Sequence, residues 1–551
     1  MTLRTSLAAT ALAAAATPAA PAPEARACGC FAPPNPAVPV VQAGERIVFA
    51  HENGEVVAHI QIQYEGDASE FGWLLPVPAV PEFALGTDEL FTQILQQTQP
   101  RYRLNTQFPD QCGGPVFAGG PGRDSASEDG NGGNGGPLVV EDSVGPYDYA
   151  VLKADDDQEM FDWLVDNSYF IPTGTEDVVG PYIRPGAYFL ALKLRSGESA
   201  GNLQPIVLRY RSDYPMIPII LTSVAANPDM GVQVWVLGEE RAIPRNYRHT
   251  VLNDEKIDWF NAGRNYNDVV IEATNEAEDG QSFVTEYAGT SAVMRDVLAP
   301  DWRFGERASF EAAADPIDFV EQMWSRSFPV TTPVLTLLER DVPVPAHWVD
   351  QGIEGANFYQ SIRFWMQRLE EEAPEAHATY LGALEFDAEK LAADLWERVV
   401  EPSREADALF DRHPKLTRLY TTLSPNEMTR DPVFAFNPDL PDVSNQHDAT
   451  FLADCDGAGG LLTLPDGRTL RVEDPSRWSA SRDDGPAPFS RRIELLREEG
   501  APLIAVDNRG EITPSYDDGG CTCVRETRGL DAPALAMMGL LGLAIFWRRR
   551  V

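Results

Sequence analysis

The sequence predicts an α+β fold with an antiparallel, β-rich N-terminal half, a helical middle segment, a small β-containing C-terminal part and a single C-terminal transmembrane helix. Three patterns support this fold class. Apolar and polar residues alternate in short runs between residues 44 and 237, as in half-buried antiparallel strands. From about residue 301 the apolar residues recur with the helical period instead. A run of 16 uncharged residues, 532–547, lies near the C-terminus.

Composition and charge exclude some classes of partner. The 551 residues include 84 acidic and 44 basic side chains, which give a net charge of −40 at pH 7. Nucleic-acid binding needs clustered Lys and Arg, so we expect no nucleic-acid partner. Adhesion to anionic lipid through charge is disfavoured for the same reason. Hydrophobic residues make up 43% of the chain, enough for packed cores rather than disorder.

The same patterns divide the chain into five parts. These are a signal peptide (1–27), a β-rich α+β domain (28–300) with a Gly-rich loop (113–136), a mainly helical segment (301–440), a small β/coil region (441–523) and a C-terminal transmembrane segment (524–551).

The N-terminus has the features of a secretory signal. Arg4 supplies a positive start, residues 6–16 form a small apolar run, and Ala25-Arg26-Ala27 offers the small-x-small pattern that signal peptidase recognises. We therefore expect cleavage between Ala27 and Cys28. A disordered Ala/Pro-rich tail is the plainer interpretation. Lipoprotein cleavage before Cys28 is weaker, because Ala25 occupies the position where an apolar residue is usual.

The apolar run 532–547 would form a helix of about 24 Å, slightly short of a hydrocarbon core of about 30 Å. A short buried helix is the alternative, but Arg548, Arg549 and Arg550 follow the run at once and fit a cytoplasmic stop. Cys521 and Cys523 precede it.

This order of cysteine, apolar helix and Arg cluster resembles the myxobacterial C-terminal sorting tag (MYXO-CTERM), over roughly the last 30 residues. The resemblance implies membrane insertion through the helix, processing by sorting machinery near Cys521 or Cys523, and display at the cell surface or release. The presence of two cysteines leaves open which one is processed.

Export would make the six cysteines candidates for disulfides. They are Cys28, Cys30, Cys112, Cys455, Cys521 and Cys523, and six cysteines allow 15 pairings. The two C-x-C pairs are expected to reach outward, because a bridge within such a pair is strained. The favoured pairing joins Cys28 or Cys30 to Cys112, and Cys455 to Cys521 or Cys523. A thiolate metal site is the alternative; no C-x-x-C pair or suitably spaced His accompanies it.

The clearest local signal is a hairpin. Strands 45–52 and 55–64 flank Asn53-Gly54, the strongest short turn signal. The expected pairing puts His51 and His59 on opposite faces, so they cannot share a metal. A proline-containing extended segment (73–78) and a short helix (86–97), capped by Thr87, follow.

The loop 113–136 holds ten glycines in 24 positions and lacks the endings of a phosphate or calcium loop. Beyond it we expect a strand at 147–153, a helix at 156–167, and further strands at 187–195, 205–211, 217–223 and 232–237.

The middle segment has amphipathic helical spacing. Two apolar stripes are expected to face a core rather than a partner; they comprise Phe358, Ile362, Trp365, Met366 and Leu369, and then Leu391, Leu395, Trp396 and Val399. Past Pro432 a second hairpin is expected around Asp466-Gly467.

Several short blocks of the sequence form a recognisable series: Cys28-Gly29-Cys30-Phe31, 45–49, 59–64, 73–78, 218–223 and 234–238. Together they resemble an exported bacterial family catalogued as domain of unknown function 2330, over about residues 28–440. The resemblance implies an exported, surface-held protein. It supplies no activity and no site residues.

Catalytic motifs are scarce. Residues 197–201 match G-x-S-x-G around Ser199. A nucleophile elbow needs a helix after the serine, whereas a hairpin turn between strands 187–195 and 205–211 is expected here. Seven scattered histidines form no helical zinc motif, and no dinucleotide fingerprint follows a strand. We therefore expect no catalytic, cofactor or metal residues. The favoured function is an exported, surface-anchored or secreted structural or binding protein; the alternative is a secreted hydrolase that uses carboxylates or Ser199.

Overall fold

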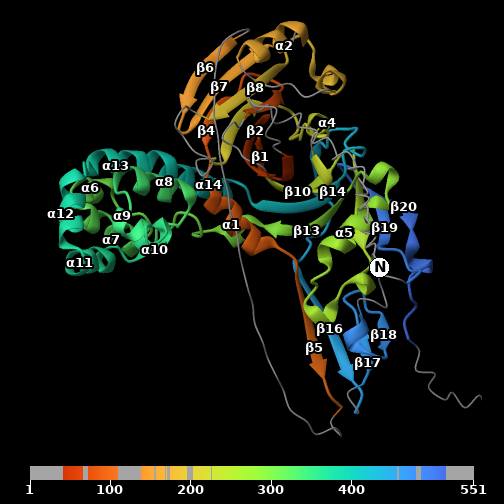
Figure 1. Cartoon of the computed structure of the whole chain (residues 1–551). Coiled ribbons are helices and arrows are strands. Elements are labelled where there is room, and N and C mark those ends of the chain that lie inside the picture. Colours follow the sequence, from red (N-terminus) through yellow and green to blue (C-terminus); the bar gives the residue numbers. More distant parts are fainter. Residues whose placement is uncertain are drawn as a thin grey trace, which may run out of the picture.

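The structure, a computed structural model, is organised around one large sheet (Figure 1). It describes residues 41–516 except 66–71, 110–137, 154–156, 168, 170–173, 195–202, 225, 456–457 and 479–484. The ten strands of the large sheet are, in spatial order, β20 (Leu503–Asp507), β19 (Ser490–Leu495), β12 (Arg248–Leu252), β13 (Ser282–Thr290), β14 (Lys415–Leu423), β10 (Ala226–Gly238), β1 (Val41–Glu52), β2 (Glu55–Glu65), β9 (Ile206–Arg211) and β4 (Glu82–Leu85).

The remaining strands form three smaller sheets. In spatial order they are β3 (Gly72–Val77), β8 (Tyr188–Leu194), β7 (Tyr147–Lys153) and β6 (Leu138–Val144); β18 (Thr469–Val472), β17 (Gly460–Thr463), β16 (Gln446–Ala453) and β5 (Arg101–Gln107); and the pair β11 (Arg241–Pro244) and β15 (Phe434–Asn437).

Most helices belong to an arm of eight, α6–α13, which extends to one side of the sheets (left in Figure 1). These are α6 (Arg307–Glu311), α7 (Pro316–Ser325), α8 (Thr332–Asp341), α9 (Ala346–Val349), α10 (Gly355–Gln360), α11 (Ile362–Glu372), α12 (Pro374–Ala383) and α13 (Ala388–Leu395). The others are α1 (Asp88–Thr98), α2 (Asp157–Asp166), α3 (Thr175–Val179), α4 (Ile219–Thr222), α5 (Tyr266–Asn275) and α14 (Glu401–Arg412).

Side-chain alternation gives the large sheet two buried faces. On the first face, residues such as Phe49, Val234 and Leu419 pack against the sheet β3-β8-β7-β6. On the second face, Val48 and Trp235 pack under α1 and α14. Because adjacent residues of a strand point to opposite faces, a strand covered on both sides must be apolar at nearly every position. The 234–237 part of β10 follows that pattern.

The hairpin predicted at 45–64 is confirmed. Glu52 pairs with Glu55 across Asn53-Gly54, and both turn residues have positive φ. The core role predicted for the two apolar stripes of the middle segment is confirmed for most positions, since Phe358, Ile362 and Leu391 lie in the core of the arm. Trp365 is only partly buried there.

Two features of the predicted β-structure need correction. The large sheet is mixed rather than antiparallel, because β1 runs parallel to β10 and β12 runs parallel to β13. The strand predicted at 217–223 is instead the short helix α4. A short, mostly buried apolar run gives no periodicity that separates strand from helix, and Pro218 directly precedes this one.

The transmembrane helix in the predicted fold class is also corrected. Within the residues that the structure describes, no helix combines the length and apolar character needed to cross a membrane. The continuous helical stretch 388–412 is long, but it is amphipathic and charged. The predicted segment 532–547 lies outside the described residues. The structure supports a mixed α/β fold with a large β-rich portion.

The large sheet extends across the boundaries predicted at residues 300 and 440. Its central strand β14 follows the helical arm in sequence, and its edge strands β19 and β20 come from the C-terminal part. The three parts of the chain therefore share one sheet.

The central position of β14 predicts where stability is concentrated. Leu419 is fully buried in β14, so Leu419→Ala is expected to cost about 2–5 kcal/mol of unfolding free energy through lost burial and a residual cavity. The matched control is Leu503→Ala in the edge strand β20, where the leucine is 48% exposed and the expected change is within about 0.5 kcal/mol. Urea denaturation of both variants measures this, and equal losses would contradict it.

Candidate functional site

The second face of the large sheet changes chemistry along its length. Under the helices it carries Val48 and Trp235, which pair across β1 and β10. Two positions earlier in both strands, the paired residues are Arg46 and Gln233. Gln233 also pairs with Tyr420 of β14. This end of the face is therefore polar although it belongs to the interior of a sheet.

A buried ion pair lies at the centre of this polar end. Arg418 Nε donates to Glu286 Oε2 at 2.5 Å, and the two side chains are 6% and 1% exposed. Gln233 Nε2 also donates to Glu286 Oε2 at 3.1 Å, and its Oε1 accepts from Arg418 Nη2 at 3.0 Å. Tyr266 Oη donates to Glu286 Oε1 at 2.6 Å. Glu286 occupies a β-bulge between Thr285 and Tyr287, and bulges of this kind re-aim side chains beside active sites.

An open cavity of about 490 Å³ adjoins the ion pair, and we call it the sheet cavity. Gly44 and Gly231 pair across its floor. A Cβ on Gly231 would lie 3.0 Å from the Tyr420 hydroxyl, so any larger residue would intrude on that space. The other residues that line it are Glu45, Arg46, Leu95, Gln99, Pro100, Asp229, Gln233, Tyr266, Asn267, Glu286, Arg418 and Tyr420.

A second cavity of about 240 Å³ shares Pro100, Tyr266 and Glu286 with the first, and we call it the histidine cavity. It is lined by His249, which belongs to β12, and by His447, which belongs to β16. The ring of His447 stacks on that of Tyr102 at 4.7 Å between centroids. Burial lowers the pKa of both histidines, so both rings are neutral at pH 7.

His249 connects a hydroxyl to a carboxylate. Its Nδ1 lies 3.2 Å from Glu494 Oε2, and its Nε2 lies 3.0 Å from Thr285 Oγ1. An ionised carboxylate only accepts hydrogen bonds, which assigns the proton of the neutral ring to Nδ1 and leaves Nε2 to accept from Thr285. Burial favours the neutral acid at Glu494, but the hydrogen bond from His249 and nearby positive charge keep the pKa of this carboxyl below its ordinary value. Thr285, His249 and Glu494 thus stand in the order of a nucleophile, a base and a group that orients the base.

Asp254 adds an acid to the histidine cavity. Burial, followed by the negative charge of Asp466, raises the pKa of its carboxyl from 3.8 to about 6. The Asp254 carboxyl therefore takes up a proton in mildly acidic solution. The Glu286 carboxylate, by contrast, is hydrogen-bonded to Arg418.

The residues singled out from the sequence lie elsewhere. Ala27, Cys28, Cys30, Cys112, Ser199, Cys521 and Cys523 are outside the described residues. Cys455, in the turn after β16, forms a disulfide. The hairpin predicted around Ser199 is wrong, because the flanking strands β8 and β9 belong to different sheets. In the part of the chain that the structure describes, no three His, Cys, Asp or Glu residues are grouped to hold a metal.

The sheet cavity and the histidine cavity could not be predicted from the sequence, because the residues that line them are far apart in the chain. Glu286 and Arg418 are separated by 132 positions, and His249 and Glu494 by 245. One local signal existed: Gln233 interrupts the otherwise apolar strand run 232–237. A polar residue at a position that a buried sheet should fill with an apolar one marks a candidate site.

The comparisons give a family but no activity. A family model described as "Uncharacterized protein conserved in bacteria (DUF2330)" matches residues 22–322. That range contains Arg46, Gln233, His249 and Glu286 but ends before Arg418 and Glu494. No curated protein and no solved structure was found to match this chain.

The raised pKa of Asp254 predicts a pH dependence of stability. The folded protein holds the Asp254 proton more tightly than the unfolded chain, so this contribution is present below about pH 4 and is lost as the pH rises to about 6. In Asp254→Asn the contribution disappears. Urea denaturation between pH 4 and 7 should therefore show the variant gaining stability relative to the wild type as the pH rises. A constant difference across that range would show that the pKa is not raised.

Proposed function

We propose that this chain, which belongs to the bacterial DUF2330 family of uncharacterised proteins, is an exported binding protein for a small polyhydroxylated ligand such as a saccharide. The sheet cavity is the binding site. The observation that carries the proposal is the polar end of an otherwise apolar sheet face, where Gly44 and Gly231 leave room beside the buried Arg418–Glu286 pair.

Stability alone does not account for this arrangement. Burying an ion pair is costly, and apolar residues of similar volume often serve stability as well or better. Glycine inside a strand also gives up packing. A cavity of about 490 Å³ lies within the range of about 300–1,000 Å³ typical of small-molecule sites.

The lining determines the class of ligand. Two arginines, Arg46 and Arg418, are matched by the carboxylates of Asp229 and Glu286, so the cavity has no excess of positive charge. Amides and phenols add both donors and acceptors. Hydroxyl groups donate and accept equally well, which suits a ligand with many of them, and the rings of Tyr266 and Tyr420 offer apolar surface.

A second candidate, a hydrolase, is favoured by one observation. The Glu494–His249–Thr285 hydrogen bonds line up a base with a hydroxyl beside a cavity that also contains the protonatable Asp254. Ser199 has no such support, because the strand that follows it, β9, replaces the helix that a nucleophile elbow requires.

Export is the part of the proposal that rests on the sequence. The signal-like residues 1–27 support it, and so does the disulfide at Cys455, because structural disulfides persist in oxidising compartments. We place N-terminal cleavage between Ala27 and Cys28 and a second processing step at Cys521 or Cys523, so that the protein is held at the cell surface or released.

The export proposal predicts the mass of the mature protein. Intact mass spectrometry is expected to show a chain that begins at Cys28 and gains two mass units per disulfide on reduction. Ala27→Asp is expected to block the cleavage, because it removes one of the two small residues that signal peptidase recognises. Arg26→Asp, which leaves Ala25 and Ala27 in place, is the control. A cytosolic protein that retains Met1 and carries only free thiols would contradict it.

The binding proposal predicts saturable binding at the sheet cavity. Isothermal titration of the protein with common monosaccharides and their β-linked dimers is expected to find at least one ligand. Gly231→Val should abolish binding by filling the cavity, and Asn267→Ala should weaken it by removing an exposed amide. Gly382→Val, in α12 with no atom within 4 Å of the added Cβ, is the matched control.

The same titration separates the two candidates. A ligand that is recovered intact supports binding, whereas a shortened ligand supports the hydrolase. In the second case Asp254→Asn and Thr285→Ala show which group acts. Failure of the whole panel, or unchanged binding by Gly231→Val, would contradict the proposal.

A further inference from the structure

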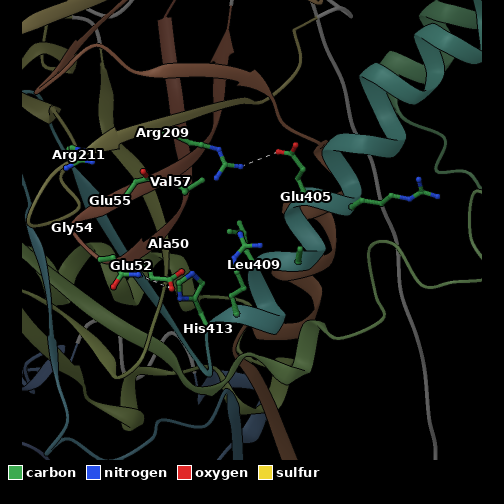
Figure 2. Close-up of a pocket in the computed structure, with 14 residues that line it drawn as sticks. Ala50, Glu52, Gly54, Glu55, Val57, Arg209, Arg211, Glu405, Leu409 and His413 are labelled. Carbon is green, nitrogen blue, oxygen red and sulfur yellow. Dashed lines mark hydrogen bonds and ion pairs between the residues drawn. The ribbon is translucent and has the colours of Figure 1, made fainter.

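A cleft of about 750 Å³ lies between α14 and strands β2 and β9, apart from the sheet cavity and the histidine cavity. Figure 2 shows Arg209 and Arg211 on the strand side and Glu405 and Leu409 on the helix, with His413 at one end. Of the fourteen residues that line the cleft, four are arginines. We call it the arginine cleft.

Secondary structure explains how the arginines converge. Arg209 and Arg211 are two apart on β9, so they point to the same face of the sheet. Arg404, Ala408 and Arg412 follow one another at four-residue spacing, so they share one face of α14. Each wall of the cleft therefore contributes two arginines to its lining, and the small side chain of Ala408 stands between the two on the helix.

Three of these arginines are available for a ligand. Arg209 pairs with Glu405 at 3.3 Å, but the side chains of Arg211, Arg404 and Arg412 make no hydrogen bond or ion pair with any residue the structure describes. Elsewhere on the surface, Arg471 and Arg509 are held by neighbouring carboxylates at 2.5 and 2.6 Å. Single arginines such as Arg103 and Arg184 also lack a side-chain partner among the described residues, but the cleft brings three unpaired arginines into the lining of one cavity.

The acidic residues of the cleft offset this charge only in part, because three glutamates, Glu52, Glu55 and Glu405, stand against four arginines and leave a net charge of +1. Glu405 is engaged by Arg209. Glu55 lies at the hairpin end, across from Arg211 in the β2–β9 register. Arg412 also lies in the last turn of α14, where a cation offsets the helix dipole, but that role needs neither Arg211 nor Arg404.

We propose that the arginine cleft is a second binding site, for a small molecule that carries two or more carboxylate or phosphate groups. Guanidinium groups bind such oxyanions through paired, charge-assisted hydrogen bonds, and two walls of arginines suit a ligand with anionic groups at both ends. The site does not depend on the sheet cavity, because the two share no lining residue.

The test titrates the full chain with citrate and with pyrophosphate at low ionic strength. Binding is expected for at least one, and added salt should weaken it. Arg211→Gln and Arg412→Gln are each expected to weaken binding at least about tenfold, which corresponds to about 1.4 kcal/mol. Ala408→Glu places a carboxylate between the helix arginines and should abolish binding while leaving every arginine in place.

The matched control is Arg477→Gln, since Arg477 is 82% exposed and reaches a carboxylate only at 3.9 Å. Gly231→Val should bind the anion normally, which separates this site from the sheet cavity. Citrate binding alone assigns a carboxylate ligand, and pyrophosphate binding alone assigns a phosphate ligand. Absence of binding by both, or equal binding by wild type, Arg211→Gln, Arg412→Gln and Ala408→Glu, would overturn the proposal.

Discussion

The ion pair between Arg418 and Glu286 organises the interior of this protein. It joins β14 to β13 and, through Gln233, to β10, so three strands of the large sheet meet in one set of hydrogen bonds. Arg418 also lies over the ring of Trp235, 5.3 Å from its centroid, where the apolar part of the sheet face begins. Because an unpaired buried charge is strongly destabilising, both partners fix the register of the strands that carry them.

The two proposed sites relate to this sheet in different ways. The sheet cavity uses side chains that the strands hold rigidly, and its charges are matched within the protein. The arginine cleft uses more exposed side chains at the hairpin end, where the charges are not matched. A rigid, neutral cavity favours selection by hydrogen-bond geometry, whereas an exposed basic cleft favours attraction of opposite charge.

How much of this could be predicted depended on distance along the chain. The hairpin at Asn53-Gly54 and the packing of Phe358 and Leu391 were predictable, because turn chemistry and helical spacing are local signals. The parallel pairing of β1 with β10 was not, since the partners are 184 to 187 positions apart and no local pattern records their contact. The same holds for Thr285, His249 and Glu494, whose residue types are ordinary until the fold brings them together.

The place of β14 in the sequence has a consequence for biogenesis. When a chain is made or exported from its N-terminus, β10 and β13 emerge before β14, the strand that bridges them, and the whole helical arm intervenes. Until residue 423 has emerged, the nascent sheet consists of two unjoined parts, β10-β1-β2-β9-β4 and β12-β13, each with open edges. Such edges recruit other strands, so the interval before β14 arrives is when a holding chaperone would matter most.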